Sequence, residues 1–447
     1  MPQKIVIVGC GAAGVSAASA ARKTDRRAEI TLLEAERNPA YSRCGIPYVI
    51  EGKIPSFESL VIYPPSYYNM MKLDLHTETQ VTDIDASAKT VKAVSKDGKE
   101  LVFNYDSLIL ATGASAFVIP VQGSNLPGVY GVRTLDDGKT ILEASKVAKS
   151  AVVIGARFVG LETAVALMER GLKVTVIELL PQILDGILDP ELAQEIQEKL
   201  EKTGIKFIIG TGISEIVGKE RVEAARAGPH EVKTDMVIMA TGVRARTDLA
   251  KKIGAAMGET KLIKVDERME TSVKGVYAAG DCVESTSAIT GKPTMSQLGT
   301  NAVRQGKVAG INAAGGSIAY PKILGACVTR ILDTEIASTG LSEVYAKKNN
   351  IECVSVTAEA EARPPYLPER LPVRIKLIAK TDGKLIGAQI MSQKEVGPRI
   401  DTISTAIMRN TTAQELILFD HAYCPPVADV SEPLSVVAEL LARKLKS

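Results

Sequence analysis

Short apolar runs alternate with glycine-rich turns and longer mixed stretches along most of the chain. The first run, residues 4–8, is apolar at nearly every position, which is typical of a strand buried on both faces of a parallel sheet. A glycine-rich turn follows, then an alanine-rich helix to about residue 22 and a second apolar strand at residues 29–33. This order of strand, turn, helix and strand predicts an α/β fold.

The turn after the first strand has the spacing of a dinucleotide-binding motif. In such a motif the first glycine permits a tight turn, the second lets a pyrophosphate approach the backbone, and the third lets the helix pack on the strand. The helix N-terminus then faces the phosphates. An acid lies twenty residues after the last glycine, where it can accept ribose hydroxyls. We therefore predict a nucleotide site formed by Gly9, Gly11, Ala12, Ala13, Gly14 and Glu34.

The same pattern restarts near the middle of the chain. A strand is predicted at residues 151–154, then a turn, a helix at residues 161–170 and a strand at residues 173–177. An acid again ends the last strand, eighteen residues after the final glycine of the turn. Arg157 stands where the motif has its second glycine. We predict a second nucleotide site formed by Gly155, Arg157, Gly160, Glu178 and Gly242.

The remaining pattern divides the chain into three domains. From residue 325 onward the sequence changes to alternating strand-like segments, such as residues 373–379 and 385–391, and two helical stretches, which predicts an α+β domain. We predict two Rossmann-like domains and this C-terminal domain. Their bounds are 1–112 with 243–324 for the first nucleotide-binding domain, 113–242 for the second, and 325–447 for the C-terminal domain.

Composition excludes several classes of function. The 447 residues carry a formal net charge of +2 and no basic stripe, so nucleic acid is not an expected partner. No apolar run reaches the ~18 residues that would span a bilayer, and no secretory segment precedes the first strand. We expect a cytoplasmic protein without a membrane partner. Six cysteines are scattered without a CxxC pair and three histidines are unclustered, so no metal site is expected.

One cysteine stands out by its position. Cys44 lies ten residues after Glu34, and no second cysteine follows within the next few positions. The alternative interpretation is a buried, inert thiol, the common state of a cysteine in a cytosolic chain. We predict that Cys44 is redox-active and that the rest of the chain brings electrons and substrate to it.

Taken in order, these motifs make the whole chain resemble the flavin-dependent pyridine nucleotide-disulfide oxidoreductases. The resemblance implies FAD on the first unit, where Arg43, Ala111, Thr112, Gly113 and Asp281 join the residues named above. It implies NADH or NADPH on the second unit. It further implies a C-terminal domain that forms a homodimer and completes the partner's site.

Within this family the cysteine pattern resembles the single-cysteine branch. That branch includes coenzyme A-disulfide reductases, NADH oxidases, NADH peroxidases and sulfur or polysulfide reductases. The sequence Cys-Gly-Ile-Pro-Tyr at residues 44–48 resembles the coenzyme A-disulfide and sulfur reductases. Ala40 replaces the serine that coenzyme A-disulfide reductases usually carry. The first glycine loop lacks the histidine of the peroxidases, which disfavours peroxidase chemistry.

The implied chemistry assigns roles to further residues. Cys44 as thiolate would attack a small disulfide, persulfide or polysulfide, which requires a lowered thiol pKa. Tyr423, in the motif at residues 421–426 and brought from the second subunit, is the candidate proton donor. Coenzyme A, as substrate or ligand, would need cations for its phosphates. The candidate substrate-binding residues are Arg22, Ser42, Arg43 and Tyr366.

Several alternatives stay open from the sequence alone. An oxidase would send the same electrons to oxygen, and a flavin-binding redox sensor would use Cys44 as a switch. Arg157 either pairs with a phosphate or obstructs NAD(P)H, and we expect retained but weakened binding. Glu178 favours NADH over NADPH because it repels a 2′-phosphate. Cys424 beside Tyr423 is a candidate resolving thiol in trans, although a small packed residue is the favoured interpretation.

Overall fold

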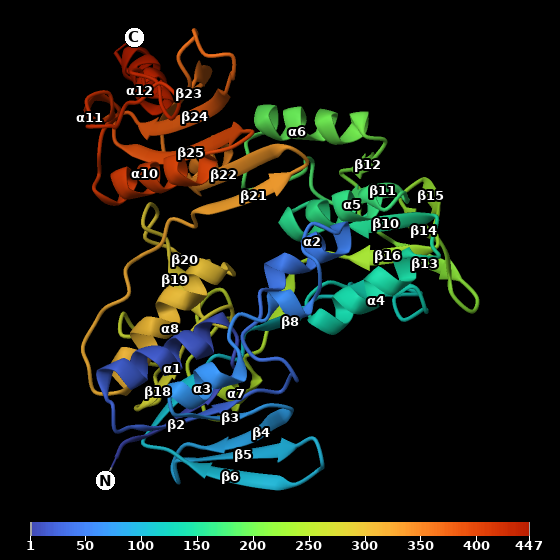
Figure 1. Ribbon diagram of the computed structural model, residues 1–447, viewed down its shortest axis with the longest axis vertical. Helices are drawn as coiled ribbons and strands as arrows, with labels where there is room; N and C mark the ends of the chain where they lie inside the picture. Colours follow the sequence, from blue (N-terminus) through green and yellow to red (C-terminus); the bar gives the residue numbers. More distant parts are fainter. Residues whose placement is uncertain (1, 447) are drawn as a thin grey trace.

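The computed structural model describes residues 2–446 and contains two parallel sheets built on the same plan. The first sheet has the order β18-β7-β1-β2-β3, with every neighbouring pair parallel. Its strands are β1 (Lys4–Val8), β2 (Glu29–Leu33), β3 (Leu73–His76), β7 (Ser107–Leu110) and β18 (Val276–Ala278). Helices α1 (Ala12–Thr24) and α8 (Gly299–Ala313) pack against each other beside it (Figure 1). The strands predicted at residues 4–8 and 29–33 are confirmed.

The second sheet repeats this arrangement with the order β12-β11-β10-β16-β9. All of its pairs are parallel too, and β10, β11 and β16 take the places of β1, β2 and β7. Its strands are β9 (Val129–Gly131), β10 (Ser150–Ile154), β11 (Lys173–Glu178), β12 (Lys206–Ile209) and β16 (Met236–Met239). Its helices are α4 (Leu135–Ser145), α5 (Phe158–Glu169) and α6 (Pro190–Lys202). The predicted second unit is therefore present.

Each unit also carries a three-stranded antiparallel sheet inserted at the same point of its topology. The first consists of β4 (Thr79–Asp85), β5 (Thr90–Ser95) and β6 (Glu100–Asn104). The second consists of β13 (Glu215–Gly218), β14 (Val222–Ala227) and β15 (His230–Lys233). The chain leaves the first unit through β8 (Ala114–Ala116) and returns through β17 (Val243–Ala245), and these two strands pair antiparallel. The predicted domain bounds near residues 112 and 243 lie beside this pair.

The C-terminal part is an antiparallel sheet with helices on one face (Figure 1). Its strand order is β21-β22-β25-β24-β23, and nearly every residue of the central strands is buried. The strands are β21 (Cys327–Ile331), β22 (Thr334–Gly340), β23 (Cys353–Glu361), β24 (Pro372–Lys380) and β25 (Leu385–Ser392). The helices are α9 (Glu343–Lys348), α10 (Val396–Met408), α11 (Ala413–Leu416) and α12 (Pro433–Lys444). The predicted α+β character is confirmed.

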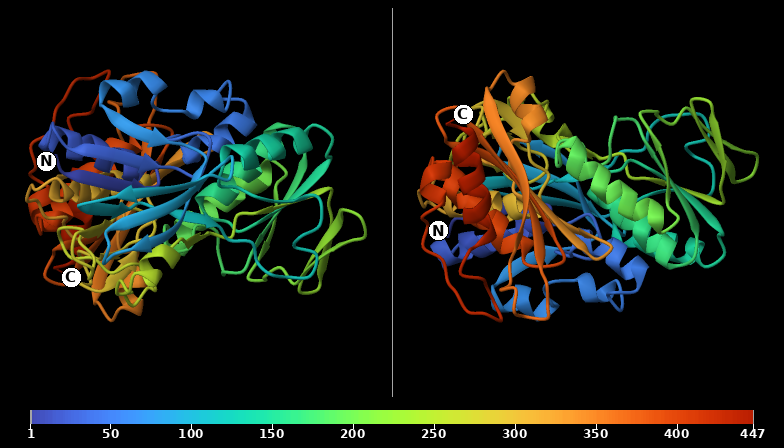
Figure 2. Two further views of the ribbon diagram at one scale, coloured as in Figure 1. Left: turned by 90° about the horizontal axis from the view of Figure 1, so that it is seen from below. Right: turned by 90° about the horizontal axis from the view of Figure 1, so that it is seen from above.

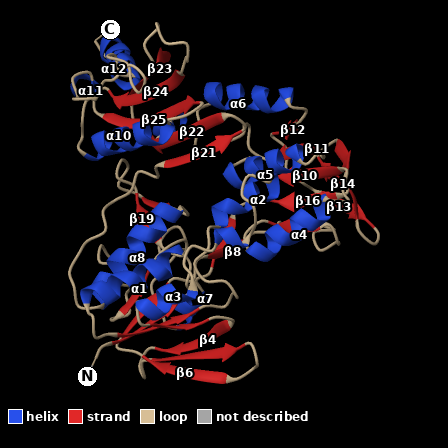
Figure 3. Ribbon diagram, in the orientation of Figure 1, coloured by secondary structure: helices blue, strands red, loops and turns tan. Residues whose placement is uncertain are grey.

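The two nucleotide units and the C-terminal sheet meet around a short helical segment. This segment comprises a 3₁₀ turn at Arg43–Gly45 and helix α2 (Ile46–Glu51), which packs against α4 and α5. Figures 2 and 3 show the second unit projecting to one side of the other two bodies. The remaining elements are a 3₁₀ turn at Glu58–Leu60, α3 (Pro65–Met70), α7 (Asp248–Lys252), β19 (Glu284–Thr286) and β20 (Pro293–Met295). Within residues 2–446, no helix is long and apolar enough to cross a membrane.

Candidate active site

The first glycine turn is shaped by two contacts that exclude side chains. Gly9 has a φ of +100°, and a Cβ there would lie 2.3 Å from the carbonyl oxygen of Ala111. A Cβ on Gly14 would lie 1.9 Å from the carbonyl oxygen of Gly9. A Cβ on Gly11 would meet no protein atom within 4 Å, so this position faces open space at the N-terminus of α1. These are the three roles that the motif assigns to its glycines.

Glu34 closes the turn from the end of β2. Its carboxylate accepts hydrogen bonds from the backbone N–H of Cys10 at 2.6 Å and of Glu36 at 2.9 Å. Burial raises the pKa of Glu34, and these two backbone hydrogen bonds oppose that rise. A carboxylate has about four lone-pair sites, so acceptor capacity remains for ribose hydroxyls. Glu34 therefore holds the turn in place and keeps the predicted binding role available.

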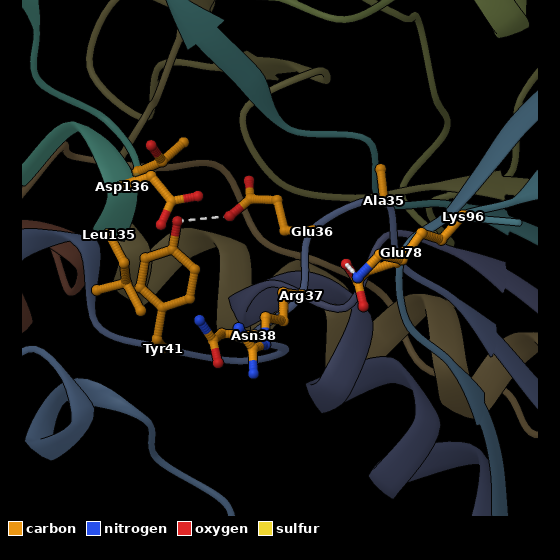
Figure 4. Close-up of a pocket in the computed structure, with 10 residues that line it drawn as sticks. Ala35, Glu36, Arg37, Asn38, Tyr41, Glu78, Lys96, Leu135 and Asp136 are labelled. Atoms are coloured by element: carbon orange, nitrogen blue, oxygen red, sulfur yellow. Dashed lines mark hydrogen bonds and ion pairs between the residues drawn. The ribbon is translucent and has the colours of Figure 1, made fainter. Parts of the chain in front are cut away.

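A cavity of about 540 Å³ opens next to Glu34 along the chain. Figure 4 shows Glu36 directed at the hydroxyl of Tyr41, which donates a hydrogen bond to it at 2.6 Å. Arg43 pairs with Glu36 at 2.8 Å, lies over the ring of Tyr41 and donates to its hydroxyl. The other lining residues are Ala35, Arg37, Asn38, Glu78, Lys96, Thr134, Leu135 and Asp136. The cavity that follows Glu34 is thus lined largely by polar side chains, several of which are held in place by hydrogen bonds and an ion pair.

Asp281 follows β18, at the same carboxyl edge of the first sheet as the glycine turn. Its carboxylate forms an ion pair with Arg133 at 2.6 Å, a partner that the sequence did not indicate. The Thr112 hydroxyl donates to the carbonyl of Arg246 at 2.6 Å, and Gly113 has a φ of +62°. Asp281 therefore lies at the edge of the first nucleotide cradle, and the guanidinium of Arg133 balances its charge.

The second glycine turn repeats the geometry of the first. A Cβ on Gly155 would lie 2.5 Å from the carbonyl oxygen of Ala240, and a Cβ on Gly160 would lie 2.0 Å from that of Gly155. Glu178 accepts from the backbone N–H of Ala156 at 2.6 Å and of Leu180 at 2.8 Å. Gly242 takes a φ of +96° after β16, where β-carbons are disfavoured.

Arg157 occupies the open position of this second turn. Its backbone is extended, with φ −94° and ψ −169°, a conformation that suits any residue. The side chain is exposed, and its charge acts on Cys327 and Tyr345 in the C-terminal part of the chain. The guanidinium is therefore within electrostatic range of the C-terminal part, and it starts from the place where the first unit has bare backbone.

Cys44 lies in the 3₁₀ turn that leads into α2 and is exposed. The groups that act on its thiol come from three directions, because Glu162 lies on α5, Arg133 precedes α4 and Asp281 follows β18. Desolvation by the surrounding protein raises the pKa of Cys44; Glu162 and Asp281 raise it further and Arg133 lowers it. The protein's own groups therefore do not lower this pKa, and the lowering that the thiolate chemistry requires stays a prediction.

The other cysteines of the two units have different surroundings. Burial, followed by the charge of Glu34, raises the pKa of Cys10 to about 12. Cys282 is fully enclosed, and burial raises its pKa as well. A thiol with a raised pKa and no access to solvent is a poor nucleophile. Cys44 thus differs from both by being exposed.

Two tyrosines that the sequence indicated separately lie together on the C-terminal part. The hydroxyls of Tyr366 and Tyr423 are 3.4 Å apart, and both side chains are more than half exposed. Tyr366 comes from the loop between β23 and β24, and Tyr423 from the loop between α11 and α12. Within residues 2–446, neither tyrosine hydrogen-bonds to the Cys44 segment of its own chain.

Comparison with protein families identifies the family to which this combination of elements belongs. The family of pyridine nucleotide-disulphide oxidoreductases matches residues 3–306, and the dimerisation domain of the same family matches residues 328–433. The chain belongs to the pyridine nucleotide-disulphide oxidoreductase family. FAD and NAD(P)H are therefore its cofactors, and both cradles fit a dinucleotide because each combines a bare or open backbone turn, a helix N-terminus and an acid.

Three relatives show the range of this oxidoreductase family. A Methanocaldococcus jannaschii protein named NADH oxidase is 44% identical over 447 residues, which cover 99% of this chain and 100% of that protein. A Pyrococcus horikoshii NAD(P)H coenzyme A polysulfide/persulfide reductase is 35% identical, with 99% of both chains covered. The structure of a NAD-dependent persulfide reductase from A. fulgidus matches with a TM-score of 0.96 at 36% identity, covering 99% of this chain and 84% of that one.

The candidate substrate residues of this oxidoreductase lie in two different settings. The guanidinium of Arg22 donates to four backbone carbonyls, those of Arg26, Ala28, Met71 and Lys72, so the structure gives it a structural role. Its contact with a coenzyme A phosphate stays a prediction. Arg43 is engaged by Glu36 and Tyr41, and Ser42 immediately precedes the 3₁₀ turn that carries Cys44. Arg43 and Ser42 are thus brought beside the cysteine, and Arg22 is held elsewhere.

Several residues around Cys44 were missed by sequence reasoning. Glu162 accepts a hydrogen bond at 2.5 Å from Thr329, whose strand β21 belongs to the C-terminal sheet. Burial raises the pKa of the Glu162 carboxyl, and the Tyr48 side chain on α2 is one of the groups that oppose this rise. Arg133 forms an ion pair with Asp281, and its charge lowers the pKa of Cys44. No motif spacing marks these residues, because their partners lie in other parts of the chain.

Proposed function

We propose that this chain is an NAD(P)H-dependent flavoprotein reductase of a small disulfide, persulfide or polysulfide, with coenzyme A disulfide as the best single candidate. The observation that carries the proposal is the position of Cys44. It is an exposed thiol in a turn between the two nucleotide cradles, and all six cysteines are free. A lone thiol at this place is suited to a substrate that supplies the second sulfur itself.

The chemistry needs only one cysteine. The Cys44 thiolate attacks one sulfur of the substrate disulfide, so that a mixed disulfide forms and one thiolate leaves. FAD, when bound, carries an electron pair from the nicotinamide to this mixed disulfide. Two electrons cleave the new sulfur–sulfur bond, which restores the Cys44 thiolate and releases the second thiolate of the substrate. Each substrate thiolate takes a proton on release.

Tyr423 is the proposed source of a proton, acting from the partner subunit of a homodimer. Its hydroxyl is exposed and lies 3.4 Å from that of Tyr366, so the two form one hydrogen-bonding unit. The same loop leaves Leu418, Val427 and Val430 largely exposed, and such apolar surface is often covered by a partner. The family's dimerisation domain, which matches residues 328–433, supports this assignment.

The relatives support two possible electron acceptors, a sulfur substrate and oxygen. The names of the Pyrococcus horikoshii and A. fulgidus proteins state a sulfur substrate, and the first also names coenzyme A. The Methanocaldococcus jannaschii relative, named NADH oxidase, supports reduction of oxygen as the second candidate function. We further propose NADH as the preferred donor, because Glu178 ends β11 and the exposed residues that follow it, Leu179 and Leu180, offer no cation for a 2′-phosphate.

An anaerobic titration tests this function. NADH is added to the purified yellow protein until the flavin is reduced, and coenzyme A disulfide, then polysulfide, is added in turn. We expect reoxidation by at least one sulfur substrate in the wild type and none in Cys44→Ser. Reoxidation by oxygen alone would favour the oxidase. A flavin that stays oxidised with both NADH and NADPH would overturn both and favour a redox sensor.

A further inference from the structure

The two loops that carry the exposed tyrosines are each anchored by a buried charge. Tyr366 lies in the loop of residues 362–371, which has Arg363 near its start, and Tyr423 lies in the loop of residues 417–432, which ends on Glu432. The side chains of Arg363 and Glu432 are 4% and 12% exposed, whereas both tyrosines are more than half exposed. A buried charge is costly unless it is paired, so each anchor needs a charged partner.

Two residues at the start of α10 join these anchors into one network of charges. Glu395 forms an ion pair with Arg363 and lies 3.5 Å from the guanidinium of Arg399. The Nε and Nη2 groups of Arg399 donate to the carboxylate of Glu432 at 2.8 and 3.3 Å. The guanidinium of Arg399 therefore contacts both carboxylates, and it links the first tyrosine loop to the second.

The centre of this network has an unusual backbone. Glu395 has φ +68° and ψ 22°, a left-handed conformation that residues with a side chain rarely adopt. Its carbonyl oxygen accepts a further hydrogen bond from Arg399 at 3.2 Å. Burial raises the pKa of Glu395, but the hydrogen bond and charge of Arg363 and the charge of Arg399 outweigh this, so the pKa is lowered. A strained conformation of this kind persists where several contacts hold it, and such positions cluster at functional sites.

The tyrosine hydroxyls meet at the outer side of the two anchored loops. They are 3.4 Å apart and exposed, and one exposed contact of this length contributes little to holding two loops together. The second loop is also closed across its base, where a ring nitrogen of His421 lies 3.1 Å from the carbonyl oxygen of Val430. The buried charges are therefore the contacts that fix where the two loops lie relative to each other.

We propose that this one buried charge network positions the pair of tyrosine hydroxyls. Its members are Arg363, Glu395, Arg399 and Glu432. They are positioning residues, since they act through the tyrosines and not on a substrate. The inference rests on the proposed function only in giving the tyrosine pair a use, because it explains what holds the proposed proton donor in place.

The test measures how close the two rings lie and needs no substrate. The flavin-loaded protein is illuminated briefly with tris(bipyridine)ruthenium(II) and persulfate, which oxidise exposed tyrosines to phenoxyl radicals that couple when their rings are adjacent. Peptide mass spectrometry then quantifies dityrosine between Tyr366 and Tyr423. We expect Arg399→Met to lower this yield about tenfold, because a hydrogen bond to a charged group shifts an equilibrium by about that factor. Arg399→Lys keeps the charge without the planar fork, so its yield should be intermediate.

Two controls separate this effect from a general structural change. The rings of Tyr63 and Tyr67 in the first unit are stacked with 4.2 Å between their centroids, so their coupling in the same samples should stay unchanged. Lys394→Met removes an exposed ion pair with Glu369, which lies in the same loop as Tyr366, and should leave the yield at the wild-type level. If Arg399→Met does not fold, Arg399→Lys carries the test.

Equal Tyr366–Tyr423 yields in the wild type and in both Arg399 variants would overturn the proposal. So would a wild type in which Tyr63 couples to Tyr67 while the pair on the C-terminal part does not couple. A failure of coenzyme A disulfide as substrate would overturn the proposed function and leave the cross-link yields, and therefore this inference, unaffected.

Turnover gives a second measurement where coenzyme A disulfide is a substrate. Arg399→Met should then lower kcat with little change in KM, and it should lower kcat little further in a protein that already carries Tyr423→Phe, because both changes act through the same hydroxyl. Fully additive losses would show that Arg399 acts independently of the tyrosine, which would contradict a positioning role.

Discussion

The two nucleotide units share the same strand order and the same glycine-turn geometry, and they differ in what their helices touch. In both, the first and third glycines are forced by contacts of 1.9–2.5 Å between a hypothetical Cβ and a backbone carbonyl. In both, the acid after the second strand accepts two backbone N–H groups around the turn. The same cradle is therefore used twice; within the motif the two units differ at the second glycine position, where Arg157 stands in place of the counterpart of Gly11.

The first difference concerns the helix after the turn. Helix α1 packs against α8 of its own unit so closely that a Cβ on Gly306 or Gly310 would lie 2.1 Å from a carbonyl oxygen of α1. Helix α5 packs instead against α2 and β21, beside Cys44. The helix of the first unit is therefore enclosed within its own unit, whereas the helix of the second unit packs against the segment that follows Cys44.

The largest expected effects come from filling the third glycine of each unit. Gly14→Ala places a Cβ 1.9 Å from the carbonyl oxygen of Gly9, and Gly160→Ala places one 2.0 Å from that of Gly155. Each substitution forces the helix away from the strand and lowers the free energy of unfolding by about 1–3 kcal/mol or more. We expect Gly14→Ala to be purified without flavin, and Gly160→Ala to keep its flavin but lose reduction by NADH. Absorbance of the flavin measures both.

Dithionite supplies the control for Gly160→Ala, since it should bleach the flavin without using the nicotinamide site. If Gly160→Ala also lost its flavin, the two units would not fold as separate cradles, and the comparison would fail. If Gly14→Ala kept its flavin, the close contact in the first unit would not be required for binding.

A second prediction concerns the charged cluster that ties the second unit to the C-terminal sheet. Lys376 on β24 is 4% exposed and pairs with Asp189, Glu191 and Glu343. Lys376→Met would leave the buried Asp189 without its cation, which costs about 3–5 kcal/mol. We expect a lower midpoint of urea unfolding. The matched control is Lys384→Met, whose exposed pair with Asp382 contributes about 0–1 kcal/mol.

An equal midpoint for Lys376→Met and Lys384→Met would contradict this interpretation of the cluster. It would mean that other donors stabilise the Asp189 carboxylate without the lysine. These donors are the backbone N–H groups of Glu343 and Val344 and the side chain of Gln389. The second unit would then be held to the C-terminal sheet mainly by apolar packing.

The sequence predicted most of the fold because the information was local. Each glycine motif, its strand and its acid lie within about thirty residues, and the apolar strands are continuous runs. The strands β1, β2, β10 and β11 therefore appear within a residue or two of their predicted bounds. Cys44 could be singled out for the same reason, since the sequence Cys-Gly-Ile-Pro-Tyr at residues 44–48 is itself local.

The surroundings of Cys44 could not be predicted, because they depend on contacts between distant segments. Arg133 and Asp281 are 148 residues apart, and Glu162 and Thr329 are 167 residues apart. Sequence spacing says nothing about which of many charged residues meet across domains. The rise in the Cys44 pKa that desolvation and Glu162 cause, against the lowering by Arg133, could not be foreseen for this reason.

The smallest expected effect tests the one residue that breaks the symmetry of the two motifs. Gly11 and Arg157 share an extended backbone at the helix N-terminus, and a Cβ on Gly11 meets open space. The Arg157 side chain extends from the equivalent place, where a pyrophosphate approaches the backbone. We expect Arg157→Gly to lower the KM for NADH by about threefold to tenfold, or about 0.7–1.4 kcal/mol, with kcat little changed.

The mirror variant Gly11→Arg makes this prediction sharper. The first unit encloses its helix against α8, so an arginine at its open position should prevent flavin from binding rather than weaken it slightly. An unchanged KM in Arg157→Gly would show that the arginine lies clear of the nucleotide, toward Cys327 and Tyr345. A raised KM would show that it pairs with a phosphate, in which case the second unit uses a cation where the first uses bare backbone.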